Sequence, residues 1–289
     1  MRANYHTHCD FCDGKAPAAE MARAAKEAGF EILGFSSHAP IVQPMPWALR
    51  PERLSEYAAE IRRLKEAWAP GGEEARAHGS MEILLGLEID WFPGERRPGD
   101  GAFDGLALDF SIGSVHYVAP RGCTPFAVDA HREGFDSCLA ASGATAREVY
   151  RDYYRRLSAL IVSGGFDILG HFDLVQKNNM DGSLFEEDED YLSAAFEAVH
   201  CLEGRDCVVE INLGGMTRHA APRPYPSLAI LRELNRAGAP ICFSADAHSP
   251  ENLGPSLDAA EKMARELALA AGYRSIRILK DGEWIDRGI

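Results

Sequence analysis

Histidine and carboxylate side chains follow several short apolar runs of this 289-residue sequence. His6 and His8 are spaced by two residues, and so are Asp246 and His248. Successive side chains of an extended strand alternate between its two faces, so the members of each pair would point the same way. Imidazole nitrogen and carboxylate oxygen are ligands that suit Zn, Mn or Fe. The two pairs therefore predict a metal site.

The same residue types recur at the ends of four further apolar runs. With the two pairs, the candidate ligands are His6, His8, His38, Glu88, His116, His171, Asp246 and His248. Eight such residues exceed the four ligands of one tetrahedral ion, so we expect two or three divalent ions with a carboxylate bridging them. His78, His131 and His200 fall away from the run ends, and we expect these three to be solvated.

Seven apolar runs alternate with amphipathic segments, which is the pattern of parallel βαβ units. Residues 54–68, 149–160, 187–202, 226–237 and 250–271 predict helices. The predicted strands are Asn4–His6, Ile32–Ser36, Ile83–Ile89, Phe110–Val115, Asp167–Leu169, Val208–Leu213 and Ile241–Ser244. We expect an α/β fold with a closed or nearly closed (βα)7 barrel, and a doubly wound open sheet is the alternative. In either fold, active sites form at the C-terminal strand ends, where the candidate ligands fall.

No internal repeat or low-complexity linker divides the sequence, so we predict one domain over residues 1–289. Segments 39–51 and 119–143 exceed normal loop length and are candidate substrate-selecting loops. A short C-terminal hairpin is expected within about residues 273–289, turning at Asp281-Gly282.

The formal net charge of −14 argues against a nucleic-acid or membrane partner, because both need a basic surface. No apolar run approaches the roughly 20 residues that span a bilayer, and no signal-peptide pattern opens the sequence. Seven cysteines suggest no disulfide framework, and Cys9 and Cys12 are expected to be reduced. We therefore expect a cytoplasmic protein with a small-molecule partner, and the sequence gives no oligomeric state.

The motifs around the candidate ligands resemble those of the PHP superfamily, named for polymerase and histidinol phosphatase domains. The motifs are HTH (6–8), SSH (36–38), GLEID (86–90), GSVHY (113–117), GHFD (170–173) and SADAH (244–248). Within that superfamily, the sequence is most similar to the monofunctional histidinol-phosphate phosphatases. The resemblance implies a distorted (βα)7 TIM-like barrel with a trinuclear metal centre at the C-terminal ends of its strands.

The resemblance also implies three groups of ligands. The first is His6, His8, Glu88 and Asp246, the second is Glu88, His116 and His171, and the third is His38, His248 and a residue of the first loop. Many family members have a histidine at the position of Gly14. Because Gly14 has no side chain, we expect the neighbouring carboxylate of Asp13 to take that place.

The implied activity is hydrolysis of L-histidinol phosphate to L-histidinol and phosphate in histidine biosynthesis. A metal-bound hydroxide would attack phosphorus in line, and no phosphoenzyme would form. Arg218, in the loop 214–226, resembles the family's phosphate-binding arginine, and a bidentate guanidinium suits a phosphate. His219 is a candidate general acid, and Lys177 and Asn212 are candidate substrate contacts. Asp90 and Asp173 could receive the substrate amine or orient histidines that bind metal.

Three alternative functions remain open at this point. A PHP phosphoesterase acting on nucleotides or other small phosphate esters would keep the same metal site. An amidohydrolase also uses an HxH pair on a barrel, but Glu88 stands where a bridging lysine would be expected. A metal-storing or metal-sensing regulator lacks support, because the sequence has no DNA-binding motif.

Overall fold

The protein is described by a computed structural model that covers residues 1–41, 45–92, 94–219 and 221–289. Its main sheet has seven parallel strands, and their order in space is their order along the chain. The strands are β1 (Ala3–Asn4), β2 (Ile32–Phe35), β3 (Glu82–Asp90), β4 (Phe110–Ser114), β7 (Ile168–Leu169), β8 (Val208–Asn212) and β9 (Ile241–Ser244). Each lies where the sequence predicts one, and no end differs from the prediction by more than two residues.

The first and last strands meet just beyond their C-terminal ends. The backbone N–H of His8 donates to the carbonyl of Ala247 at 2.8 Å, and the N–H of Ala247 donates to the carbonyl of His6 at 3.1 Å. These bonds form a parallel bridge between Thr7 and Ala247 that nearly closes the ring of strands. The predicted barrel is therefore confirmed. The doubly wound alternative is wrong, because such a sheet reverses its strand order and keeps two open edges.

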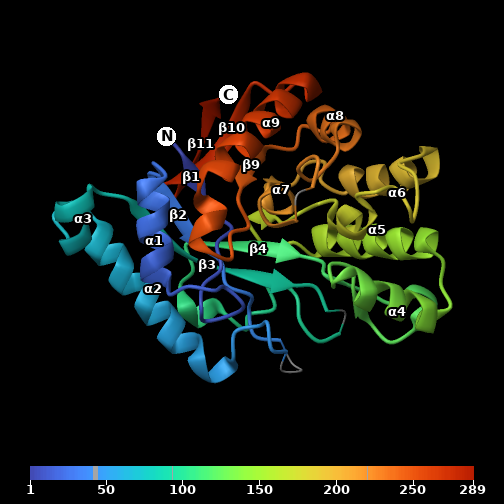
Figure 1. Ribbon diagram of the computed structural model, residues 1–289, viewed down its shortest axis with the longest axis horizontal. Helices are drawn as coiled ribbons and strands as arrows, with labels where there is room; N and C mark the ends of the chain where they lie inside the picture. Colours follow the sequence, from blue (N-terminus) through green and yellow to red (C-terminus); the bar gives the residue numbers. More distant parts are fainter. Residues whose placement is uncertain (42–44, 93, 220) are drawn as a thin grey trace.

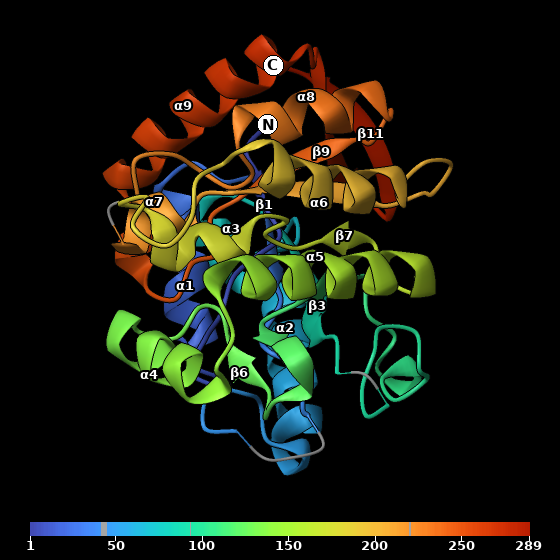
Figure 2. The same ribbon diagram turned by 90° about the vertical axis from the view of Figure 1, so that its right-hand side faces the viewer.

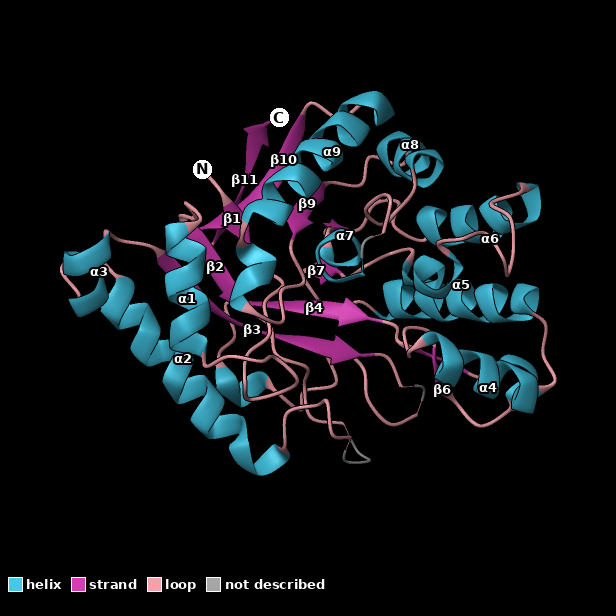
Figure 3. Cartoon of the chain, in the orientation of Figure 1, coloured by secondary structure: helices cyan, strands magenta, loops and turns pink. Residues whose placement is uncertain are grey.

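Helices surround the barrel, as Figure 1 and Figure 3 show. On α2, residues Tyr57, Ile61, Leu64 and Trp68 are buried at steps of three and four, which is the apolar stripe that the sequence predicts. The start of α5 is fixed by reciprocal hydrogen bonds between Thr145 and Glu148. The helices are α1 (Ala18–Glu27), α2 (Leu54–Trp68), α3 (Glu73–His78), α4 (Arg132–Ser142), α5 (Ala146–Ser163), α6 (Glu189–His200), α7 (Gly214–His219), α8 (Leu228–Arg236) and α9 (Pro255–Ala271). None of the described helices is both long and apolar enough to cross a bilayer.

The predicted helix over 250–271 is two helices in the structure. A 3₁₀ helix, η5 (Pro250–Leu253), comes first and is capped by Ser249, and α9 follows. The break occurs because Pro255 lacks an N–H and disfavours helical backbone in the residue before it. Gly254 is accordingly extended.

The predicted long loop 119–143 is wrong in part. Two short strands, β5 (Tyr117–Val118) and β6 (Phe126–Ala127), pair in an antiparallel manner, and helix α4 follows them. Strands of two residues are too short to show an alternating pattern, so no pattern in the sequence indicates them. Figure 2 shows α4 and β6 together on one side of the molecule. The other long segment, 39–51, includes residues 42–44, which lie outside the described part of the chain.

The C-terminal hairpin is present, formed by β10 (Ser275–Lys280) and β11 (Glu283–Gly288). Asp281 and Gly282 form the turn, and both have positive φ, as a two-residue hairpin turn of this kind requires. The backbone N–H of Leu279 donates to the Tyr5 hydroxyl at 2.8 Å, which ties the hairpin to the chain just after β1.

Candidate metal centre

Four candidate ligand atoms converge at the C-terminal ends of β1, β3 and β9. Nε2 of His6 and of His8 lie 3.2 and 3.6 Å from Oε2 of Glu88, and 3.7 and 3.5 Å from Oδ1 of Asp246. A four-coordinate ion with bonds of about 2.0–2.2 Å separates its ligand atoms by about 3.3–3.6 Å. These four distances are close to those between the ligands of a tetrahedral metal site.

Three of these four atoms lack a hydrogen-bond partner in the described part of the chain. Nε2 of His6, Nε2 of His8 and Oε2 of Glu88 are buried and accept or donate no hydrogen bond among the described residues. Burying polar atoms without partners is costly, and a cation at the centre of the group would satisfy all three. The donor set of imidazole and carboxylate also fits Zn, Mn or Fe. The residues thus fit a bound divalent ion.

The two carboxylate oxygens of Glu88 face different groups of imidazoles. Oε2 faces His6 and His8, and it also lies 2.9 Å from Nδ1 of His38. Oε1 accepts from the Ser114 hydroxyl at 2.6 Å and lies 2.9 Å from Nε2 of His171. A carboxylate placed in this way could hold a divalent ion on each of its two sides. A second compact group of possible ligands is formed by His38, Glu88 and His116. His171 lies beside Glu88 but outside that group, unlike the expected second set.

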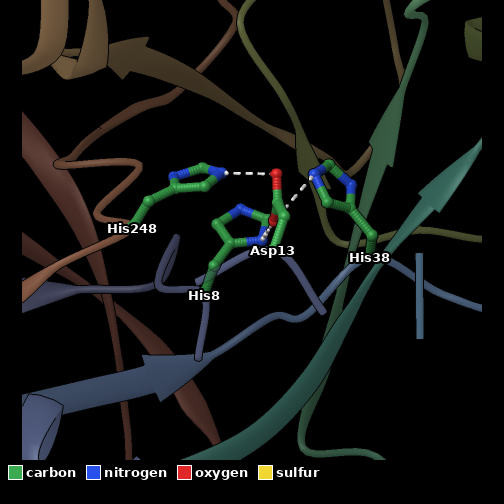
Figure 4. A group of neighbouring side chains, drawn as sticks. All are labelled: His8, Asp13, His38 and His248. Atoms are coloured by element: carbon green, nitrogen blue, oxygen red, sulfur yellow. Dashed lines mark ion pairs between the residues drawn. The ribbon is translucent and has the colours of Figure 1, made fainter. Parts of the chain in front are cut away.

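A third group of possible ligands is drawn in Figure 4 and consists of His8, Asp13, His38 and His248. Oδ2 of Asp13 lies 3.4 Å from Nε2 of His248, and its Oδ1 lies 3.8 Å from Nε2 of His38. The structure thus brings Asp13 to the two histidines expected beside it, and it adds His8. His8 belongs to the first group as well as the third, and His38 belongs to the second as well as the third.

Backbone geometry at two candidate ligands is unusual. His171 and Asp246 both have positive φ, at 24° and 49°. Such values are rare outside glycine, and strained residues of this kind cluster at functional sites. The side chains of both residues lie within the cluster, His171 beside Glu88 and Asp246 beside His8.

Carboxylates behind the cluster orient two of the imidazoles. Oε1 of Glu210 lies 2.6 Å from Nδ1 of His6, and Oδ1 of Asp90 lies 2.6 Å from Nδ1 of His116. Each contact fixes the ring so that Nε2 faces the site. The orienting role expected for Asp90 agrees with this contact, whereas Glu210 was not predicted. Its signal was a lone acidic residue inside the apolar run 208–213.

Electrostatics keep the central carboxylates ionised. Burial alone would raise the pKa of Glu88, but the imidazoles of His6, His38 and His116 more than reverse this and hold it well below its usual range. Burial likewise opposes ionisation of Asp246, and Arg218 and His6 hold its pKa well below normal. Metal binding needs deprotonated carboxylates, so both side chains are in the form that binds a cation.

A cavity of about 650 Å³ opens onto the cluster, a size typical of small-molecule sites. Arg218, His219 and Lys177 all line it, and Arg218 lies on the short helix α7 rather than in a loop. One guanidinium nitrogen of Arg218 donates to Oδ2 of Asp246 at 2.7 Å, and another lies 3.0 Å from Nδ1 of His248. The expected phosphate-binding group is therefore beside the candidate ligands. His78, His131 and His200 are exposed, as expected.

His219 and Asn212 lie in different surroundings. Burial, Lys177 and Arg218 lower the pKa of His219 to about 4, and its role as general acid stays a prediction. Asn212 is not among the cavity-lining residues, because its amide is held by Glu210, Asp246 and Gly214. It supports carboxylates instead of contacting substrate.

Asp173 has neither role proposed for it. It is fully buried and accepts hydrogen bonds from the hydroxyls of Tyr154 and Tyr191. It lies neither in the cavity lining nor within hydrogen-bond distance of a candidate ligand among the described residues. Burial raises its pKa to about 6.

The sequence matches the PHP domain family over residues 4–213, more than two thirds of the chain. This chain belongs to the PHP family. The match covers the barrel strands from the end of β1 to β8, together with the candidate ligands from His6 to His171.

Proteins similar to this PHP protein are named histidinol-phosphatases. The "Probable histidinol-phosphatase" of Deinococcus radiodurans is 30% identical over 91% of this chain and 92% of its own. The histidinol-phosphatase of Bacillus subtilis is 27% identical over 88% and 96%. The histidinol phosphate phosphatase of Lactococcus lactis, solved with Zn, L-histidinol and phosphate, superimposes with a TM-score of 0.65 at 20% identity, covering 98% of both chains. The protein is a metal-dependent PHP-family hydrolase.

The backbone around Gly14 in the first loop leaves no room for a side chain. A Cβ at this position would lie 2.4 to 2.7 Å from backbone atoms of Cys9, so no side chain fits. The loop packs too tightly there for a histidine, and the adjacent Asp13 carries the carboxylate to His248.

Asp13→Ala should lower the metal content by about one ion per chain, because the third group loses its carboxylate. The protein would be loaded with Zn or Mn, freed of excess metal and measured by elemental analysis. Asp10→Ala is the matched control, since Asp10 is an exposed carboxylate in the same loop. Equal metal content in Asp13→Ala and wild type would exclude Asp13 as a ligand.

Glu210→Gln should weaken metal binding by about 10- to 100-fold. Oε2 of Glu210 accepts from the backbone N–H of His171 at 2.7 Å and from the Asn212 amide at 2.9 Å. The NH₂ group of a glutamine would face either these two N–H donors or Nδ1 of His6. In either orientation at least one hydrogen bond of Glu210 is lost. Competition with a chromogenic chelator measures the affinity, and excess metal should restore activity. Glu203→Gln, an exposed change before β8, is the control. Unchanged affinity would contradict the positioning role.

Proposed function

We propose that this PHP protein is a histidinol-phosphatase, which hydrolyses L-histidinol phosphate to L-histidinol and phosphate. The observation that carries the proposal is the convergence of His6, His8, Glu88 and Asp246, with Arg218 in contact with Asp246 in the cavity that opens onto this group. The choice of substrate is supported by the shared name of the relatives and by the L-histidinol and phosphate bound to the Lactococcus lactis protein.

We further propose three ligand sets. The first is His6, His8, Glu88 and Asp246, the second is His38, Glu88 and His116 with His171 beside Glu88, and the third is His8, Asp13, His38 and His248. Divalent ions held there would activate water and polarise the phosphoryl oxygens.

The protein's own groups place the ester for this reaction. Arg218 offers two N–H groups in one plane, which match two phosphoryl oxygens. It approaches from α7, so the phosphate would lie between α7 and the carboxylates of the barrel. Glu210 and Asp90 hold His6 and His116 in fixed orientations, so the site needs little rearrangement when substrate arrives.

The test is phosphate release by the purified protein loaded with Mn or Zn. The substrates would be L-histidinol phosphate, a sugar phosphate, a nucleotide and an aryl phosphate, with chelator-stripped protein as the blank. We expect a kcat/KM for L-histidinol phosphate that is about 100-fold or more above the others. Equal, low values on every ester would reject the proposed substrate, and a preference for the nucleotide would favour the alternative phosphoesterase.

A further inference from the structure

The cavity beside the metal centre is lined by four carboxylates among its described residues: Asp13, Glu88, Asp129 and Asp246. Three of them belong to the candidate ligand groups, and Asp129 belongs to none. Asp129 follows β6, whereas Arg218 lies on α7, and these two elements lie apart in Figure 2 and Figure 3. One wall of the cavity thus carries an acid that the metal centre does not use.

The backbone around Asp129 is held from both sides. The N–H of Val128 donates to the carbonyl of His116 at 2.8 Å, and the Asn178 amide donates to the carbonyls of Val128 and Ala130 at 2.9 and 3.0 Å. The ammonium of Lys177 donates to the backbone carbonyl of Asp129 itself at 2.6 Å. Asp129 is therefore placed beside the centre without depending on a bound ligand.

The carboxylate of Asp129 remains available. Its side chain is 32% exposed, and no hydrogen bond to its oxygens exists among the described residues. Lys177 lies 3.8 Å from Oδ2, too far for a hydrogen bond, because its ammonium is engaged by the main chain. In a buried structural ion pair, the ammonium would lie closer to the carboxylate and would hydrogen-bond to it. The Asp129 carboxylate can therefore accept hydrogen bonds from a cationic ligand.

Aromatic rings stand beside the same wall. Trp47 and Tyr117 line the cavity with ring centroids 6.1 Å apart at 25°, and the Trp47 ring meets His38 edge-on at 4.8 Å. Flat apolar faces next to an acid suit a ligand that has a planar ring and a cationic group. Asp129 would repel a phosphate, which directs that end of the ligand toward Arg218 and Lys15.

We propose that Asp129 binds the ammonium group of the substrate and thereby determines its selectivity, with Trp47 and Tyr117 contacting the ring. This inference rests on the proposed function for the identity of the ester. It assigns Asp129 no part in proton transfer or metal binding. The amine of L-histidinol phosphate, two bonds from the carbon that carries the ester oxygen, is the group it would recognise.

The test compares two substrates in each protein: L-histidinol phosphate and its analogue without the amine, 3-(imidazol-4-yl)propyl phosphate. Asp129→Asn should lower kcat/KM for L-histidinol phosphate by about 10- to 100-fold, mainly through KM, and leave the analogue unchanged. Glu133→Gln, an exposed change on α4, should alter neither value. Because the result is a ratio of two substrates, a fraction of unfolded protein cancels. An equal loss on both substrates, or a loss on neither, would overturn the proposal.

A second substrate pair separates this inference from the proposed function. If wild type does not prefer L-histidinol phosphate over an aryl phosphate, the proposed function fails. The role of Asp129 would still hold if wild type prefers 2-aminoethyl phosphate to ethyl phosphate and Asp129→Asn abolishes that preference. If the preference persists in the variant, or never existed, the role of Asp129 is rejected as well.

Discussion

Glu88→Gln should lower kcat/KM by about a thousandfold or more, the largest effect we expect from a single isosteric change. Its two oxygens face different groups of imidazoles, with Oε2 3.2 Å from His6 and Oε1 2.9 Å from His171. An amide has one acceptor oxygen and no charge, so it cannot serve both groups. We therefore expect the variant to lose metal as well as activity.

Three properties of the variant would be measured on the same preparation. Metal content after loading with Zn or Mn should fall by at least one ion per chain, phosphate release should fall to near the chelator-stripped level, and circular dichroism should show an intact fold. Glu27→Gln, an exposed change on α1, should match wild type in all three. Full metal content with near-normal turnover in Glu88→Gln would contradict a bridging role.

The barrel and the positions of the candidate ligands could be predicted from the sequence because strand-end residues follow recognisable apolar runs. The motifs around His6, Glu88 and Asp246 each end such a run, and parallel strands bring those ends to one edge. Local spacing is enough to place these residues on the same side of the sheet. It does not determine which imidazole faces which carboxylate, because that depends on strand stagger and on the strained backbone at His171 and Asp246.

The residues that support the site were harder to find. Glu210 sits inside a buried strand, where a carboxylate requires a partner, but the sequence does not reveal that the partner is His6, 204 positions away. Asp129 follows a strand of two residues, which has no periodic signal. Asn212 looked like a contact at a strand end, yet its amide turns inward to Glu210 and Asp246. Tertiary contacts decide these roles.

Arg218→Lys should lower kcat/KM by about 10- to 100-fold although the positive charge is kept. The guanidinium reaches Oδ2 of Asp246 and the ring of His248 at once, which a single ammonium cannot reproduce. It would also offer two parallel N–H groups to a phosphate, where lysine offers a point charge. The decrease should appear for every phosphate ester, unlike the selective loss expected for Asp129→Asn. Arg232→Lys, an exposed change on α8, is the control, and metal content must be checked because Arg218 contacts Asp246. A lysine variant with wild-type kcat/KM and full metal content would show that charge alone suffices at this position.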